Sequence, residues 1–245
     1  MIEFQGLCKT YGGFEAVKPL TLSVQRGELF GFLGPNGAGK TSTIRMMMGI
    51  LVPSAGRVLI DGLDCHGEAA DVKRRVGYLP DTPVFYDYLR GREILQFVAE
   101  MHGFSRAEAI GRSTRLLAEF GIADAAEDYA VNYSLGMKKR LGLACALIHD
   151  PAVLILDEPI NGLDPRAARE VQERLLAATA RGVTVFVSTH LLDMAEKLCD
   201  RVGIIHRGQL VATGTLDELR AEASASGSLE DVFLKITDEA GGSPP

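Results

Sequence analysis

The sequence lacks the features that would place the chain within a membrane or in an oxidising compartment. No segment approaches the roughly 18 consecutive apolar residues of a membrane-spanning helix. The first residues, MIEFQGLCKTY, carry no basic stretch followed by a long apolar segment, so no signal peptide is expected. The cysteines form no CxxC pair, which favours buried thiols in a reducing compartment; they are Cys8, Cys65, Cys145 and Cys199. We therefore expect the chain in the cytoplasm.

An excess of positive charge is also lacking, since 26 Lys and Arg face 32 Asp and Glu for a net charge of −6. Nucleic-acid binding depends on Lys and Arg that neutralise phosphates, so we expect no nucleic-acid partner. The best local basic patch is Lys138 to Arg140. The composition is 47% hydrophobic and 24% charged over 245 residues, and no internal repeat is visible. These values fit one large domain, or a domain with an inserted lobe.

Short apolar segments bounded by turns predict strands near residues 26–34, 57–62, 152–159, 183–190 and 201–208. Several lack apolar–polar alternation, which is typical of parallel strands covered on both faces, and helical stretches separate most of them. An α/β fold with a mainly parallel core sheet is therefore predicted. Residues 1–11 and 19–28 have no helix between them and predict an additional antiparallel β layer.

The middle of the chain, about 89–148, has helical patterns and no convincing strand, which predicts a helical lobe inserted into a single domain spanning 1–245. Ser105 and Glu108 have the spacing of a capping box, and Gly121 follows where that helix should end. Residues 221–228 are predicted to be a linker. A C-terminal helix is predicted over 229–237, and 238–245 are expected to be disordered.

A phosphate-binding loop is predicted after the strand at 26–34. The segment GPNGAGKTS matches G-x-x-x-x-G-K-[ST] between a strand and a helix, so a chance glycine turn is a poor alternative. Its backbone N–H groups would surround phosphates, the lysine would reach the β- and γ-phosphates, and the threonine hydroxyl would bind Mg²⁺. The expected nucleotide-binding residues are Gly34, Pro35, Asn36, Gly37, Ala38, Gly39, Lys40, Thr41 and Ser42.

Two carboxylates end the buried strand VLILDEP. Asp157 is expected to hold Mg²⁺, directly or through water, and Glu158 to act as general base toward the attacking water. The alternative is that the two acids merely end a strand.

With these motifs the chain resembles the nucleotide-binding subunits of ATP-binding-cassette (ABC) transporters, which are P-loop ATPases. The ordered set is Tyr11, GPNGAGKTS, GYLPD, YSLGMKKRL, VLILDEP, NGLD and STH, and the resemblance covers nearly everything from residue 1 to about 220. In such ATPases two subunits pack head to tail, with each ATP between the P-loop of one and the signature turn of the other. The resemblance thus implies ATP and Mg²⁺ as cofactors, and Ser134 and Gly136 as contacts to the γ-phosphate of the partner's nucleotide.

The resemblance assigns three further residues. Tyr11 would stack on adenine, although a tyrosine there is alone more often surface or core. His190 would contact the γ-phosphate and orient the water, giving the catalytic set Glu158, His190 and Lys40, although a lone strand-end histidine is usually structural. Asp164, in NGLD, would lie near the opposite P-loop, and with the following proline it also predicts a helix N-terminus.

The sequence departs from the family pattern in two places. Leu135 and Met137 stand where the family signature Leu-Ser-Gly-Gly-Gln has glycine and glutamine, so the turn must function with ordinary dihedral angles. Asp81 stands where Gln or Glu is usual, at a position that senses Mg²⁺ and water, and we expect it to act on the metal through water. The aromatics Phe85, Tyr86 and Tyr88 follow, and either receive a helix of the membrane subunit or pack the lobe onto the sheet.

The resemblance implies an ATP-hydrolysing subunit that drives a separate transmembrane permease from the cytoplasmic face of the membrane. The YSxGM signature and the C-terminal helix resemble those of exporters of the drug, polysaccharide or sodium type. A homodimer is favoured because Glu158, His190 and Ser134 are all present, so each site of the dimer could be competent. A soluble ABC ATPase of DNA repair or translation is the alternative. It would need a coiled-coil or zinc-bearing insertion, or a second cassette. A regulatory module that binds nucleotide without hydrolysing it is a third alternative, and the presence of Glu158, the expected general base, argues against it.

Overall fold

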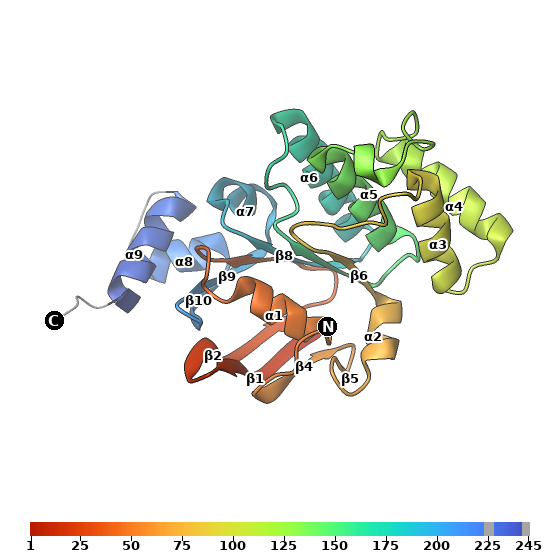
Figure 1. Cartoon of the computed structure of the whole chain (residues 1–245). Coiled ribbons are helices and arrows are strands. Elements are labelled where there is room, and N and C mark those ends of the chain that lie inside the picture. The colour runs from red at the N-terminus through yellow and green to blue at the C-terminus, as the bar shows by residue number, and fades with distance from the viewer. Residues whose placement is uncertain (223–227, 242–245) are drawn as a thin grey trace.

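The computed structural model describes residues 1–222 and 228–241, which form two sheets with helices around and between them (Figure 1). The strands are β1 (Ile2–Tyr11), β2 (Phe14–Val24), β3 (Leu29–Leu33), β4 (Ala55–Ile60), β5 (Leu63–Asp64), β6 (Val76–Leu79), β7 (Val153–Asp157), β8 (Thr184–Thr189), β9 (Arg201–His206) and β10 (Gln209–Gly214). The helices of the sheet region are α1 (Lys40–Met47), α2 (Ala69–Arg75), α6 (Pro165–Ala180), α7 (Leu192–Leu198), α8 (Leu216–Glu222) and α9 (Leu229–Gly241).

The core sheet has the strand order β10-β9-β3-β8-β7-β6 and is parallel except for the pairing of β10 with β9. Strands β3, β7 and β8 are buried along their whole length, as continuous apolar runs predict for strands covered on both faces. Parallel register brings their carboxyl ends to one edge, where Asp157 pairs with Ser188. The predicted α/β class with a mainly parallel core sheet is confirmed.

The second sheet is antiparallel, with the order β2-β1-β4-β5, and confirms the predicted β layer. Helix α1 lies between the two sheets in Figure 1, and its side chains Ile44, Met46 and Met47 join one buried cluster with residues of both. The predicted strand at 57–62 belongs to this layer as β4, next to β1. The loop before α1 is therefore held by both sheets.

The inserted lobe consists of α3 (Gly91–Met101), α4 (Arg106–Glu119), a short 3-10 turn (Ala130–Asn132) and α5 (Leu135–Leu147). Helix α4 begins as predicted, since Ser105 accepts a hydrogen bond from the Glu108 backbone N–H and Glu108 accepts one from the Ser105 N–H. Gly121 follows its end with φ of +62°, the left-handed conformation that favours glycine.

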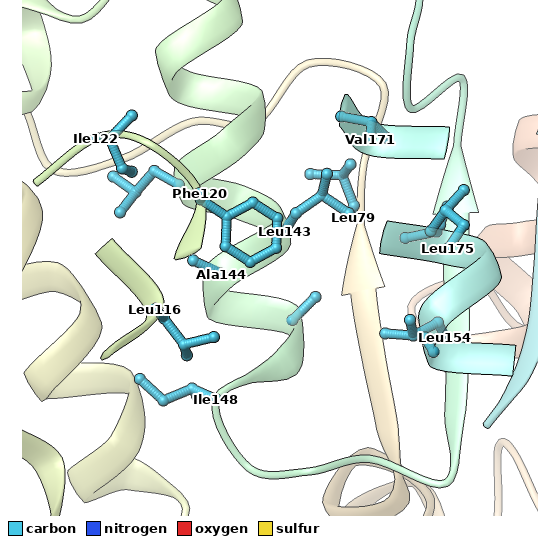
Figure 2. Packing of buried hydrophobic residues seen from close by; sticks show 14 of the residues in the cluster. Leu79, Leu116, Phe120, Ile122, Leu143, Ala144, Ile148, Leu154, Val171 and Leu175 are labelled. Atoms are coloured by element: carbon cyan, nitrogen blue, oxygen red, sulfur yellow. The ribbon is translucent and has the colours of Figure 1, made fainter. Parts of the chain in front are cut away.

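The lobe and the core sheet share one apolar cluster. Figure 2 shows Leu116 of α4 and Leu143 of α5, with Phe120 and Ile148 directly after these helices, beside Leu79 of β6, Leu154 of β7, and Val171 and Leu175 of α6. Burial of this much apolar surface stabilises the contact of the lobe with the sheet. Helix α5 consequently lies close to the carboxyl end of β7, where the catalytic carboxylates were predicted.

The C-terminal region differs from the prediction in its boundaries. Helix α8 ends at Glu222, inside the predicted linker 221–228, whose residues 223–227 lie outside the described residues. The predicted helix 229–237 is α9, which extends to Gly241 and so corrects the expected disorder of 238–241; residues 242–245 are not described. Leu229 and Val232 bury the helix against the β9–β10 side of the sheet, which supports its length. Within the described residues no helix is both long and apolar enough to span a membrane.

Candidate active site

A cavity of about 500 Å³ opens at the carboxyl edge of the core sheet, above the N-terminus of α1. It gathers most of the predicted nucleotide-binding residues from five separate parts of the chain. Its lining consists of Tyr11, Phe14, Ala16, Asn36, Gly37, Gly39, Lys40, Thr41, Ser42, Asp81, Glu158, Asn161 and His190. Gly34, Pro35, Ala38 and Asp157 lie close to lining residues along the chain without lining the cavity themselves, and Ser134, Gly136 and Asp164 belong to other segments that do not line it.

The loop before α1 has the backbone that a phosphate site requires. Gly39 caps α1 with φ of 111°, and a Cβ there would lie 2.6 Å from the carbonyl oxygen of Ala16. A Cβ on Gly34 would lie 2.4 Å from the carbonyl oxygen of Ile205. Only glycine fits these approaches, and the resulting turn directs the first N–H groups of α1 into the cavity, where the helix dipole favours an anion.

Lys40 is buried and its ammonium lies at the cavity wall. Its Nζ donates to the carbonyl oxygens of Gly34 at 2.7 Å and Pro35 at 3.3 Å, and lies 3.5 Å from Oε1 of Glu158. This places one positive charge between the loop and the predicted general base.

Thr41 and Asp157 form the expected metal-binding pair. The Thr41 hydroxyl donates to Oδ2 of Asp157 at 3.0 Å, and the Ser188 hydroxyl donates to the other carboxylate oxygen. Burial raises the pKa of Asp157, while the hydrogen bonds from Ser188 and Thr41 act in the opposite direction. A hydroxyl and a carboxylate beside a phosphate loop fit Mg²⁺, which takes oxygen ligands and usually shares them with substrate phosphates.

Glu158 is fixed in both backbone and side chain. Its φ of +48° is unusual for a residue with a side chain, and such strain persists only where the surroundings hold it. Its N–H donates to the Ser188 carbonyl at 3.0 Å, and its own carbonyl accepts from Lys139 Nζ at 2.6 Å. Its Oε1 lies 2.9 Å from Nδ1 of His190. The carboxylate is thus oriented by His190 and Lys40, in the arrangement of a base held by a second group.

One end of the cavity is formed by an aromatic hairpin. Tyr11 and Phe14 are opposite each other across a turn of Gly12 and Gly13, whose positive φ values suit a two-residue hairpin. Both rings are exposed, and Lys9 Nζ lies 5.1 Å from the Tyr11 ring centre. Phe14 was not predicted, although its place at the other end of the Gly-Gly turn was the signal for it.

The predicted signature residues lie on the surface of the lobe. Ser134 is the N-cap of α5, and its hydroxyl accepts from the Met137 N–H at 3.2 Å. Leu135 has no positive φ, as expected, and Gly136 lies in the first turn of α5. Asp164 caps α6, accepting 3.0 Å bonds from the N–H groups of Arg166 and Ala167. These backbone hydrogen bonds, with Ala167 foremost, lower the pKa of Asp164.

Asp81 and Lys139 form a contact that the sequence did not predict. The Lys139 ammonium lies 3.7 Å from Oδ1 of Asp81, so the expected metal contact has a protein partner as well. Burial lowers the pKa of Lys139, and Asp81 acts in the opposite direction. The only sequence signal for a buried Lys139 was its helical spacing. Gly142 and Leu143 follow it by three and four residues and share a buried face of α5.

The aromatic residues after Asp81 differ in burial. Phe85 is packed against the core of the lobe, whereas Tyr86 and Tyr88 are 70% and 83% exposed. Tyr86 and Tyr88 border an apolar groove of about 720 Å³, which is also lined by Leu89 and by Phe97 of α3.

A sequence model of the family described as "ABC transporter" matches residues 17–161. The "Probable multidrug ABC transporter ATP-binding protein YbhF" of Escherichia coli K12 is 37% identical over 240 residues, which cover 96% of this chain and 41% of that protein. This chain therefore spans less than half the length of that relative. The "Daunorubicin resistance ATP-binding protein DrrA3" of Streptomyces coeruleorubidus is 39% identical over 98% of this chain and 75% of the relative.

A solved structure described as the "ATP binding subunit of ABC transporter" superposes with a TM-score of 0.90. It is 34% identical in sequence, and the match covers 97% of this chain and 99% of the solved one. The whole described architecture, the lobe included, is therefore shared with that structure.

Proposed function

Because the chain belongs to the ABC transporter family and has the fold of its ATP-binding subunits, we propose that it hydrolyses ATP to drive export through a separate permease. The observation that carries this proposal is the environment of Glu158. Its carboxylate lies 2.9 Å from His190 and 3.5 Å from Lys40, in the same cavity as Thr41.

In the proposed reaction the adenine stacks on Tyr11, and the loop from Gly34 to Ser42 surrounds the phosphates with N–H groups and the Lys40 ammonium. Thr41 and Asp157, with Asp81 as a further candidate, would hold Mg²⁺, which when bound offsets part of the phosphate charge. Glu158 accepts a proton from the water whose oxygen attacks the γ-phosphorus, and ADP leaves with the electron pair of the broken bond. His190 orients Glu158 and contacts the γ-phosphate.

We further propose that a second copy completes each site, with its Ser134 and Gly136 on the γ-phosphate and its Asp164 near the opposite P-loop. The exposure of Ser134 and Asp164, and their absence from the cavity lining of their own chain, support this arrangement. Each chain has both halves, so a head-to-tail homodimer provides two equivalent sites.

We propose that the permease docks at the apolar groove beside Tyr86 and Tyr88, and that the protein lies on the cytoplasmic face of the membrane. The groove is apolar and adjoins Asp81, so a docked helix would lie next to the active-site segment. The names of the two relatives, one multidrug and one daunorubicin resistance, support a drug-like cargo. We do not propose a role in DNA repair or translation, because both named relatives are transporter or resistance proteins.

The test is affinity purification of the chain from gently solubilised membranes, with mass spectrometry of what accompanies it and ATPase assay of the isolate. A stoichiometric polytopic membrane protein and ATP turnover are expected. The double variant Tyr86→Ser, Tyr88→Ser should lose that protein, while Ile110→Ser, a matched change of an exposed apolar residue on α4, should retain it. Recovery of the chain alone, or with nucleic-acid proteins, would overturn the exporter proposal.

A further inference from the structure

Lys139 is a buried charge at the junction of three functional segments. Its side chain is only 1% exposed, and it lies on α5, in the second turn after the signature Ser134. The loop that carries Asp81 and the loop that carries Glu158 both reach its ammonium. The first of these loops leads to the apolar groove, and the second contains the catalytic carboxylate.

A contribution to folding stability does not explain why this ammonium is buried. Removing a charge from water costs several kcal/mol, and an apolar residue of similar volume is often neutral or stabilising in its place. The ion pair with Asp81 is long, at 3.7 Å, and the Asp81 side chain is 48% exposed, so the charge is only partly compensated. The short bond from Nζ to the Glu158 carbonyl, at 2.6 Å, is the strongest contact that the lysine makes.

That carbonyl belongs to the strained residue of the site. The Glu158 backbone, at φ of +48°, is held on one side by its N–H bond to Ser188. On the other side its carbonyl accepts from Lys139 Nζ and from the Asn161 N–H at 3.2 Å. The Lys139 bond therefore fixes the plane of the peptide that follows Glu158, and with it the direction in which the side chain leaves the backbone.

We propose that Lys139 is a positioning residue, which holds the Glu158 backbone in its hydrolytic conformation and links it to Asp81 and to the signature helix. A shift of α5 or of the Asp81 loop moves the ammonium, so the orientation of Glu158 responds to the partner's nucleotide and to the docked permease. The consequence for turnover rests on the proposed ATP hydrolysis, whereas the contact with the Glu158 backbone does not.

The first arm of the test measures the backbone in the nucleotide-free protein and requires no ATPase activity. Lys139→Met should accelerate amide hydrogen exchange in peptides covering 157–164, because the Asn161 N–H depends on the Glu158 carbonyl. Lys138→Met, the same change one residue earlier and outside this contact, should leave exchange at the wild-type rate. Equal exchange in Lys139→Met and wild type would overturn the proposal whether or not the protein hydrolyses ATP.

The second arm separates positioning from folding. Lys139→Met should lower kcat at least about tenfold, since small displacements of a catalytic group can cost up to about 10²-fold. Its Kd for ATP should not rise, and its Tm should not fall. Lys139→Gln should restore much of the loss, because its amide also donates a hydrogen bond to a carbonyl. Wild-type kcat in Lys139→Met would overturn the proposal, while loss of kcat together with ATP binding would show a merely structural role.

The link to Asp81 has its own test. Asp81→Asn should lower kcat, and in the double variant with Lys139→Met the loss should be smaller than the product of the two single losses, since both changes break one shared connection. Additive losses would mean that Asp81 acts independently of Lys139, which would overturn this link. If the wild type binds ATP without turnover, the proposed function fails, and the exchange measurement still decides the role of Lys139.

Discussion

The phosphate-loop region of the active site and the two exposed helix caps, Ser134 on α5 and Asp164 on α6, are built on opposite principles. Lys40, Asp157 and Glu158 are buried, and each contacts partners from its own chain. Ser134 and Asp164 are exposed, and their oxygens accept only the backbone N–H bonds of helix caps among the contacts described. A buried charge must be compensated within the fold, whereas an exposed cap retains lone pairs for another molecule. The first region is thus complete in one chain, and the second is suited to a site shared by two.

The largest effect should come from blocking the exposed region. Ser134→Arg should abolish ATPase activity, because a bulky cation would occupy the position of the proposed γ-phosphate contact, while nucleotide binding to the isolated chain persists. Steady-state ATPase and fluorescent-nucleotide titration measure the two. Ser105→Arg removes a similar cap from α4 and controls for lost helix stability. Equal loss of binding and activity would mean that the turn serves its own chain, and the comparison would fail.

Within the buried region, Glu158→Gln should lower turnover by roughly 10²-fold or more, as expected when a general base is lost. Gln has the same size and still hydrogen-bonds His190, so ATP binding should be retained. Single-turnover hydrolysis and nucleotide titration of the same preparation check this. Unchanged turnover would exclude Glu158 as the base.

The far end of α5 offers a third, smaller effect. His149 stacks on His102 with ring centres 3.8 Å apart, and burial lowers its pKa to about 4. Between about pH 6.5 and 4 the unfolded chain binds a proton that the folded chain does not, so stability falls as pH decreases through this window, by at most about 3 kcal/mol. His149→Phe should flatten this dependence in urea unfolding at pH 7 and 5, and exposed His66→Phe should not. If the free energy of unfolding depended equally on pH in the two variants, the assignment of this dependence to His149 would be contradicted.

The smallest effect concerns Asp164, which combines a cap with a proposed intersubunit role. Asp164→Ala should lower Tm by a few degrees at most, because α6 loses its cap, whereas Asp164→Asn should keep Tm, since Asn caps helices equally well. If the charge matters between subunits, Asp164→Asn should still lower ATPase activity. Scanning calorimetry and ATPase assays of both variants separate the roles, and a lower Tm in Asp164→Asn would refute the cap argument.

The sequence predicted those parts of the molecule whose determinants are contiguous. The loop Gly34–Ser42 and the strand ending in Asp157 and Glu158 carry their own signals, because strand, turn and helix follow one another along the chain. β6 and β10 were missed. β6 has only four residues, and β10 is partly exposed at the sheet edge without a clear alternating pattern.

The missed contacts are those made by residues distant in sequence. Nothing next to Lys139 in the chain indicates that its ammonium meets Asp81 and the Glu158 carbonyl, because both arrive through tertiary packing of the lobe on the sheet. The end of α9 was predicted too early, because the apolar spacing that indicates the helix stops at Ile236 whereas the helix continues to Gly241.

The close approach of Gly39 to the carbonyl of Ala16 has a mechanical consequence. Because no side chain separates the phosphate loop from β2, the loop that carries Lys40 packs directly against the hairpin that carries Tyr11. If the rings bind the base and the loop binds the phosphates, as proposed, this contact fixes the distance between the two ends of the nucleotide site. Under the proposed function, a movement that reaches the permease would then come from the lobe turning relative to this loop and hairpin.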